Sequence, residues 1–339
     1  MIKLSMHDAE DLCTQVLAKS GYSTAHIAAI SDVLMQAQID NCQSHGLYRL
    51  LNCVTSMQKA TVSADATPEI EHISQAILKV NAHNAMVPLT LQSCIPLLAE
   101  KAKDQGIALL AINNCVHTTA LWYEIELLTQ QGLVGIACTS NHAWVVPEGG
   151  NRPLFGTNPM AFGWPRPNNQ APFIFDFSTT AMARGDIELH RKEGKLLPDG
   201  CGVDADGTPS NDPATILTTG AMKTFGSHKG SALAAMIELL AGPLIGDVLS
   251  MESQKKDAGA GGSPLGGEFI LAISPEVLLG GAMQAYLENA EQLFDGYAIQ
   301  HVRLPSSRRY AARAKNLESG SIEMHASVYQ DLMAYLQSE

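Results

Sequence analysis

The spacing of apolar side chains predicts helices at the start of the chain. Ser5 and Asp8 have the spacing of a capping box, apolar residues follow at helical intervals, and Gly21 can end this helix in a left-handed turn. A second helix is expected from about Ser23 and a third from Ser44. Residues 5–57 are therefore expected to be helical.

After Val80 the pattern changes to short apolar or alternating runs separated by turn residues, which is typical of strands. The clearest runs are GIALLAIN from Gly106, LVGIACTS from Leu133, PFIFDFST from Pro172 and EFILAIS from Glu268. Helical segments at 89–103 and 231–241 lie between them, and residues 305–336 return to a helical pattern. The low-complexity stretch 259–267 predicts a mobile loop. The middle of the chain should therefore be mixed α/β.

Composition and charge narrow the class of protein. The 339 residues are 46% apolar and 17% charged, and no apolar run approaches the roughly 18 residues that span a bilayer. A formal net charge of −12 argues against nucleic acid, which proteins meet with a basic surface. The seven cysteines form no CxxC pair, and the N-terminus lacks a signal segment. We expect a cytoplasmic protein with reduced thiols, no membrane association and a small-molecule partner.

Several common motifs are absent from the sequence. It contains no GxGxxG, P-loop, HExxH or GxSxG string and no closely spaced set of metal ligands. An ordinary Rossmann site, a motif-based metal site and acyl-transfer chemistry are therefore not indicated. Ser44 and His45 would also point roughly 100° apart on a helix, so a hydrogen bond of the triad type between them is not expected.

The stretch QSHGLYRL gathers groups that could bind and protonate a small acid. On a helix that begins at Ser44, His45 and Arg49 would project from one face. Arg49 could hold a carboxylate by two parallel hydrogen bonds and leave His45 placed to exchange a proton. An ordinary helix start with a serine cap and a surface arginine remains the alternative for this string taken alone.

Other candidate segments lie downstream. They are the loop 154–165 with Thr157, a strand end with Asp176 and Ser178, a turn Arg184-Gly185-Asp186, and His228-Lys229 ahead of a helix. Free amides and a cation before a helix can bind phosphate. The segment 301–316 adds four arginines and one lysine with no acid, which makes it a candidate anion site or a solvated helix face.

Taken in order, these strings resemble one family. QSHGLYRL, HTTALW, LFGTNPMAFGWPR, FDFSTTAMARGDIELHRKEGKLLPDGCGVDADGTP, GSHKGSALAAMIELLAG and RLPSSRRY are similar to the type 2 malate/L-lactate dehydrogenase family of NAD(P)H oxidoreductases. The resemblance covers about residues 5–335 and is strongest to the branch that reduces Δ1-pyrroline-2-carboxylate and Δ1-piperideine-2-carboxylate. Two departures are Val116, where relatives often carry a second histidine, and Thr118-Thr119 in place of Phe-Ala or Phe-Gly.

The resemblance implies an α/β fold with a non-Rossmann, mixed-sheet NAD(P)-binding domain and a helical domain formed by both termini. Residues 1–75 and 300–339 would form the helical domain that carries the catalytic Ser, His and Arg. Residues 76–299 would bind cofactor and substrate. The family also implies a homodimer with its active sites near the subunit interface.

The resemblance also implies roles for individual residues. His45 matches the proton donor, Ser44 and Asp186 match groups that tune it, and Arg49 matches the ligand of the substrate carboxylate. Further substrate contacts match Thr157, Arg184 and Gly185. Cofactor contacts match His117, Thr118, Thr119, Ala120, Leu121, Asp176, Phe177, Ser178, His228, Lys229, Arg303, Arg308 and Arg309. No metal is implied.

The implied activity is reduction of the cyclic imine to L-proline or L-pipecolate in hydroxyproline or lysine catabolism. NADPH is favoured because the segment 303–315 is basic enough to meet a 2′-phosphate, and NADH is possible. Asp186 is expected to raise the pKa of His45. Two alternatives remain open, namely a malate- or lactate-type 2-oxo acid reductase and a non-catalytic ligand-binding regulator.

Overall fold

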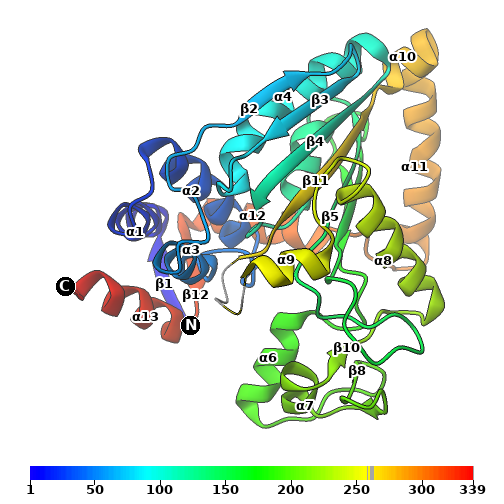
Figure 1. Cartoon of the computed structure of the whole chain (residues 1–339). Helices are drawn as coiled ribbons and strands as arrows, with labels where there is room; N and C mark the ends of the chain where they lie inside the picture. The colour runs from blue at the N-terminus through cyan, green and yellow to red at the C-terminus, as the bar shows by residue number, and fades with distance from the viewer. Residues whose placement is uncertain (258, 260–262, 339) are drawn as a thin grey trace.

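A seven-stranded mixed sheet forms the centre of the molecule (Figure 1). This computed structural model describes residues 1–257, 259 and 263–338. In spatial order the strands are β2 (Glu69–His72), β3 (Ile77–Asn81), β4 (Ile107–Val116), β11 (Leu265–Ile273), β5 (Val134–Thr139), β6 (Met160–Trp164) and β7 (Phe173–Phe177). Only β3 and β4 pair in parallel, and the other neighbours are antiparallel. The expected non-Rossmann α/β fold is confirmed.

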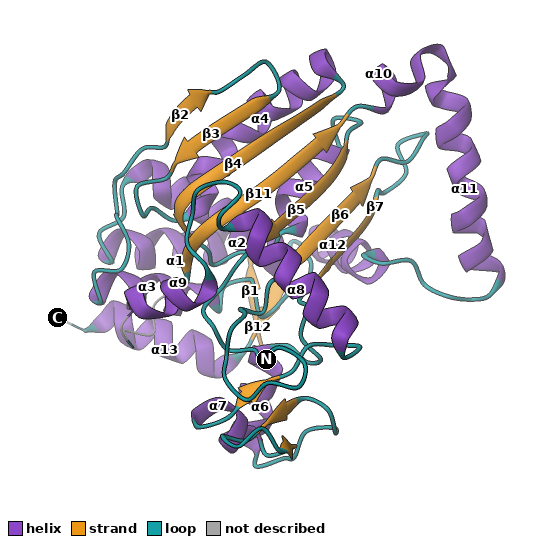
Figure 2. Ribbon diagram, turned by 45° about the vertical axis from the view of Figure 1, so that its right-hand side comes forward, coloured by secondary structure: helices purple, strands orange, loops and turns teal. Residues whose placement is uncertain are grey.

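Helices cover both faces of this sheet (Figure 2). One face packs against α4 (Val87–Gln105) and α5 (Trp122–Thr129), and the other against α8 (His228–Ala241) and α9 (Ser250–Asp257). Gly163 on β6 lets α5 approach closely, because a Cβ there would overlap Ile125 and lie 2.6 Å from the Thr129 methyl group. The predicted strands and both predicted mid-chain helices are therefore present.

Both ends of the chain build a second unit. Its elements are β1 (Ile2–Ser5), α1 (Met6–Lys19), α2 (Thr24–Ile39), α3 (Arg49–Gln58), β12 (Ser321–Met324) and α13 (Ala326–Gln337), with α12 (Ser307–Ser319) beside α2 and β12. β1 pairs with β12, and one core joins Leu17, Leu50, Ile322 and Leu332. The expected helical domain from both termini is thus confirmed, although β2, inside the predicted range 1–75, belongs to the large sheet.

Two smaller parts complete the chain. A third core lies under α6 (Arg184–Glu193), α7 (Pro213–Thr218) and the short strands β8 (Gly202–Val203), β9 (Pro209–Ser210) and β10 (Ala221–Met222). α10 (Pro275–Leu279) and a 3₁₀ turn η1 (Gly280–Ala282) lie beyond the end of β11, and α11 (Met283–Ile299) runs on the β7 side of the sheet (Figure 1). Arg166, which follows β6, forms an ion pair with Glu291 of α11.

Several sequence predictions about elements need correction. Ser5 caps α1 as expected and α2 begins at Thr24, close to its expected start, but α3 begins at Arg49 and residues 43–48 form turns. Arg184 to Asp186 form the first turn of α6 rather than a connecting turn. Strand β12 interrupts 305–336, and 265–267 of the expected loop belong to β11, while 260–262 lie outside the described residues. No described helix combines the length and apolar character needed to cross a bilayer.

Candidate active site

Gln38, buried on α2, holds the loop that carries Ser44 and His45. Its Oε1 accepts the Leu47 N–H at 2.9 Å, and its Nε2 donates to the Gln43 Oε1 at 2.8 Å and to the Glu323 carbonyl at 2.6 Å. A side chain at Gly46 would overlap the Gln38 amide and lie 3.1 Å from its Cα. The shape of the loop is therefore set by contacts with α2 and β12 and not by helical hydrogen bonding.

Because the loop is a turn, Ser44 and His45 can meet. The Ser44 Oγ lies 3.0 Å from the His45 Nδ1, within hydrogen-bonding distance. The expectation that adjacent side chains would point apart was wrong, since it assumed a helix from Ser44. One ring nitrogen of His45 is thus occupied, which leaves Nε2 for another partner.

Arg49 begins α3 beside this loop. Its Nε is buried without a hydrogen-bond partner, and no carboxylate pairs with its guanidinium among the described residues. Burial lowers the pKa of Arg49, while the negative charge of Glu188 on α6 acts in the opposite direction. A half-buried guanidinium without an ion-pair partner is suited to an anionic ligand.

The His45 imidazole is neutral in the ligand-free chain. Burial first, and the charge of Arg49 second, lower the pKa of His45 to about 3. Asp186 lies exposed on α6 and is not among the groups that act on this pKa. The expected rise of the His45 pKa through Asp186 is therefore wrong for a single chain.

Aromatic and polar residues missed in the sequence surround α6. The Arg184 guanidinium stacks 4.3 Å from the Trp144 ring centroid, and its Nε lies 3.4 Å from the Glu188 carboxylate. His142 packs edge-on against Trp144, and the Asn141 amide donates to the Thr157 Oγ1 at 3.3 Å. Their only sequence signal was the polar and aromatic string NHAW directly after the predicted strand LVGIACTS.

The predicted cofactor segment His117–Leu121 connects β4 to α5. The Trp122 N–H, just after it, donates to the Asp176 Oδ2 at 3.0 Å, so Asp176 on β7 adjoins this segment. Burial raises the pKa of Asp176 to about 6. Ser178 Oγ lies 2.6 Å from the Thr180 hydroxyl, and Phe177 stacks on Phe175 with ring centroids 5.1 Å apart.

The loop 43–48 and the predicted cofactor segment are neighbours. Burial raises the pKa of the Cys42 thiol to about 11, and the charges of Asp176, Arg308 and Arg309 all act on it. His228 and Lys229 are exposed at the start of α8, where the preceding Phe225 meets Phe177 edge-on at 5.8 Å. The fold thus draws the loop, β7 and the starts of α12 and α8 toward one region.

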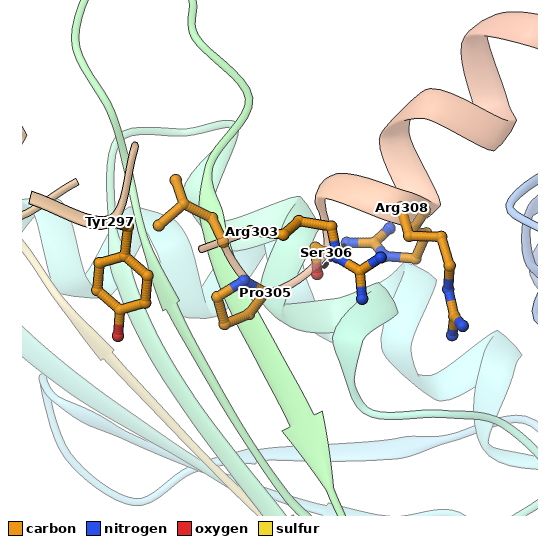
Figure 3. Close-up of a pocket in the computed structure, with 7 residues that line it drawn as sticks. Tyr297, Arg303, Pro305, Ser306 and Arg308 are labelled. Carbon is orange, nitrogen blue, oxygen red and sulfur yellow. Dashed lines mark hydrogen bonds between the residues drawn. The ribbon is translucent and has the colours of Figure 1, made fainter. Parts of the chain in front are cut away.

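A pocket of about 330 Å³ lies at the start of α12 (Figure 3). It is lined by Tyr297, Arg303, Leu304, Pro305, Ser306, Arg308 and Arg309. In the described part of the chain the exposed Arg303 and Arg308 make no ion pair. Arg309 is buried, bonds to Asp40 at 2.8 Å and to Glu126 at 2.6 Å, and lies over Trp122. The predicted cofactor contact therefore does not suit Arg309, whose guanidinium is already used.

Comparison with known proteins identifies the family. The malate/L-lactate dehydrogenase profile matches residues 4–333. The chain belongs to this family. A Δ1-pyrroline-2-carboxylate/Δ1-piperideine-2-carboxylate reductase of Pseudomonas aeruginosa is 48% identical over 99% of this chain and 100% of its own length. A Δ1-pyrroline-2-carboxylate reductase of Pseudomonas fluorescens is 50% identical over 99% of both chains.

Solved structures of the malate/L-lactate dehydrogenase type share the whole fold. The Δ1-piperideine-2-carboxylate reductase of Pseudomonas syringae superposes with a TM-score of 0.91 at 35% identity, over 98% of this chain and 99% of that one. A dehydrogenase of Sinorhizobium meliloti gives a TM-score of 0.84 at 27% identity, over 99% of this chain and 98% of that one. The similarity extends over both domains.

Proposed function

We propose that this chain is an NAD(P)H-dependent oxidoreductase that reduces Δ1-pyrroline-2-carboxylate, Δ1-piperideine-2-carboxylate or both to L-proline and L-pipecolate. This proposal rests on the half-buried guanidinium of Arg49, whose Nε has no hydrogen-bond partner and whose charge acts on the neutral imidazole of His45. Full-length relatives that bear reductase names for these imines support the substrate class. The Arg49 guanidinium can bind a carboxylate and the His45 imidazole can exchange a proton, and a cyclic imino acid needs both.

In this proposal Arg49 holds the substrate carboxylate and His45 exchanges the proton. When the ring carries a second proton, its Nδ1–H would donate to the Ser44 hydroxyl, and the Nε2 proton could pass to the imine nitrogen and leave a neutral imidazole. A carboxylate on Arg49 would also offset the positive charge that lowers the His45 pKa. Binding of the acid would therefore prepare the imidazole to carry a proton.

The pocket beside α12 fits a dinucleotide phosphate. Arg303 and Arg308 present guanidinium groups that no described residue pairs, and a 2′-phosphate takes such groups in bidentate fashion. We therefore propose NADPH as the preferred cofactor with NADH also accepted; when bound it supplies the hydride. The segment 117–121, Asp176 to Ser178, His228 and Lys229 would line the remainder of its site.

We also propose a cytoplasmic homodimer. Gly185 and Asp186 are exposed in the single chain, as expected for residues that act near a subunit interface. Thr157 and Arg184 would contact the substrate together with them. Within one chain Asp186 does not act on the pKa of His45, although Glu188, on the same helix, acts on that of Arg49.

A substrate panel tests the proposal. NADPH oxidation is measured with pyrroline-2-carboxylate, piperideine-2-carboxylate, pyruvate and oxaloacetate, and a cyclic imine should give the highest kcat/KM. His45→Ala should lower kcat roughly 100-fold without changing NADPH affinity. Preference for a 2-oxo acid would move the enzyme to the malate or lactate branch. Tight binding without turnover would identify a ligand-binding regulator.

A further inference from the structure

Two carboxyl groups that the proposed reaction does not use are buried together beneath the 117–121 segment. Glu268 on β11 and Glu124 in the first turn of α5 are each only 1% exposed. Glu268 follows the irregularity of β11 at Gly266 and lies between Ile112 on β4 and Thr139 on β5. The central strand of the sheet therefore carries an acid where its neighbours are apolar or neutral.

At neutral pH at least one of these two carboxyl groups must be protonated. Both oxygens of Glu268 and the Oε2 of Glu124 are buried without a hydrogen-bond donor. No lysine or arginine lies within ion-pair distance of either group in the described chain. Burial first, then the neighbouring carboxyl, raises the pKa of Glu124 well above its usual value, and burial raises that of Glu268 to about 7. Two adjacent carboxylates in such a site do not both ionise.

The hydrogen bonds of His117 fit a protonated Glu268. The Thr139 hydroxyl donates to the Gly267 carbonyl at 2.7 Å and the Cys115 thiol to the Gly266 carbonyl at 3.2 Å. Both can then accept from the His117 Nε2, which lies 3.1 and 3.0 Å away. The other ring nitrogen, Nδ1, then carries no proton and can accept a hydrogen bond; it lies 3.7 Å from the Glu268 Oε2.

The remaining titratable groups around the pair add no positive charge. Glu268 acts on the thiols of Cys115 and Cys138, Asp176 acts on Glu124, and Asp247 acts on Cys115. Burial keeps His117 neutral by lowering its pKa to about 4. A cation placed next to the 117–121 segment would therefore meet a group that can become negative by losing one proton.

We propose that the Glu124–Glu268 pair is a proton-releasing counter-charge for the oxidised nicotinamide ring. This inference rests on the proposed function, because it needs the ring beside the 117–121 segment. NADP⁺ binding would break one carboxyl O–H bond, send that proton to solvent and leave a carboxylate opposite the cationic ring. NADPH, whose ring is neutral, would leave the pair protonated. The step involves no change of oxidation state and no further reactant.

Calorimetry on the wild-type protein tests the coupling. NADP⁺ and NADPH are titrated separately at pH 7 in buffers of different ionisation enthalpy. NADP⁺ should release a larger fraction of a proton than NADPH, and only its affinity should rise as the pH increases through about 7. Protons linked to the 2′-phosphate cancel in this comparison, because both cofactors carry it. Equal proton release by the two cofactors would overturn the inference.

Substitutions test whether the proton released on NADP⁺ binding comes from Glu124 and Glu268. Glu268→Gln and, separately, Glu124→Gln should remove the difference in proton release and weaken NADP⁺ at pH 8 about tenfold, with NADPH affinity unchanged. Glu71→Gln, an exposed acid on β2, is the control and should behave as wild type. Retained coupling in both variants, or a stoichiometric metal ion released from purified wild-type protein, would also overturn the inference. If neither cofactor binds, the proposed function fails instead.

Discussion

The loop 43–48 depends on a glycine at position 46. Its Cα lies against the Gln38 side chain, so Gly46→Ala should force the loop away from α2 and destabilise the fold by about 1–3 kcal/mol, the usual cost of overpacking. Urea unfolding measures this loss, and kcat should fall as well. Gly281→Ala is a matched control, because nothing lies within 4 Å of its added methyl group. An unaltered unfolding free energy would mean that Gln38 moves aside freely.

At the same scale, His45 should respond to acid binding. Its folded pKa of about 3 lies below the usual 6.5, so neutral His45 contributes stability fully above pH 6.5 and progressively less as the pH falls toward 3. A bound carboxylate on Arg49 should raise this pKa. NMR titration of the imidazole with and without a planar ring carboxylate such as pyrrole-2-carboxylate measures the shift, and His45→Ala assigns the signal. If the pKa of His45 did not change in the complex, Arg49 would not be the group that binds the carboxylate.

At the scale of elements, the first turn of α12 carries two neighbouring arginines with different environments. Arg308→Ala should weaken NADPH more than NADH, since only NADPH offers a phosphate for the exposed guanidinium. Arg309→Ala should instead cost about 3–5 kcal/mol of stability, because Asp40 and Glu126 would lose a buried partner. Cofactor titrations and urea unfolding of both variants separate these effects. Equal weakening of both cofactors in Arg308→Ala would contradict the phosphate assignment.

These elements also show what a sequence can predict. The cap at Ser5 and the helix start near Ser23 could be predicted because each serine accepts from a backbone N–H only three residues away. The start of α3 was not, because Gln38 and Glu323 shape the loop before it from distant positions. Family resemblance assigned Arg309 to the cofactor, and its ion pairs could not be predicted because the partners lie far away in the chain. Glu268 was predicted only as part of a strand.

For the molecule as a whole, α2 connects the two large units. Val33 and Ala37 pack into the core beneath the large sheet, whereas Ile30 and Leu34 pack into the core shared by the two termini. Asp40, which directly follows α2, bonds to Arg309 and Arg313 of α12, and these arginines also bond Glu126 of α5. The terminal unit and the sheet are thereby held together around the proposed site.

The bond from Gln38 to the Glu323 carbonyl has a consequence for biosynthesis. The ribosome makes the loop 43–48 early, yet β12, which carries Glu323 and also pairs with β1, emerges almost last. A nascent chain can assemble the sheet and its helices before release, but it has no finished loop until translation is nearly complete. Premature termination before β12 therefore yields a protein without activity, however well the rest of it has folded.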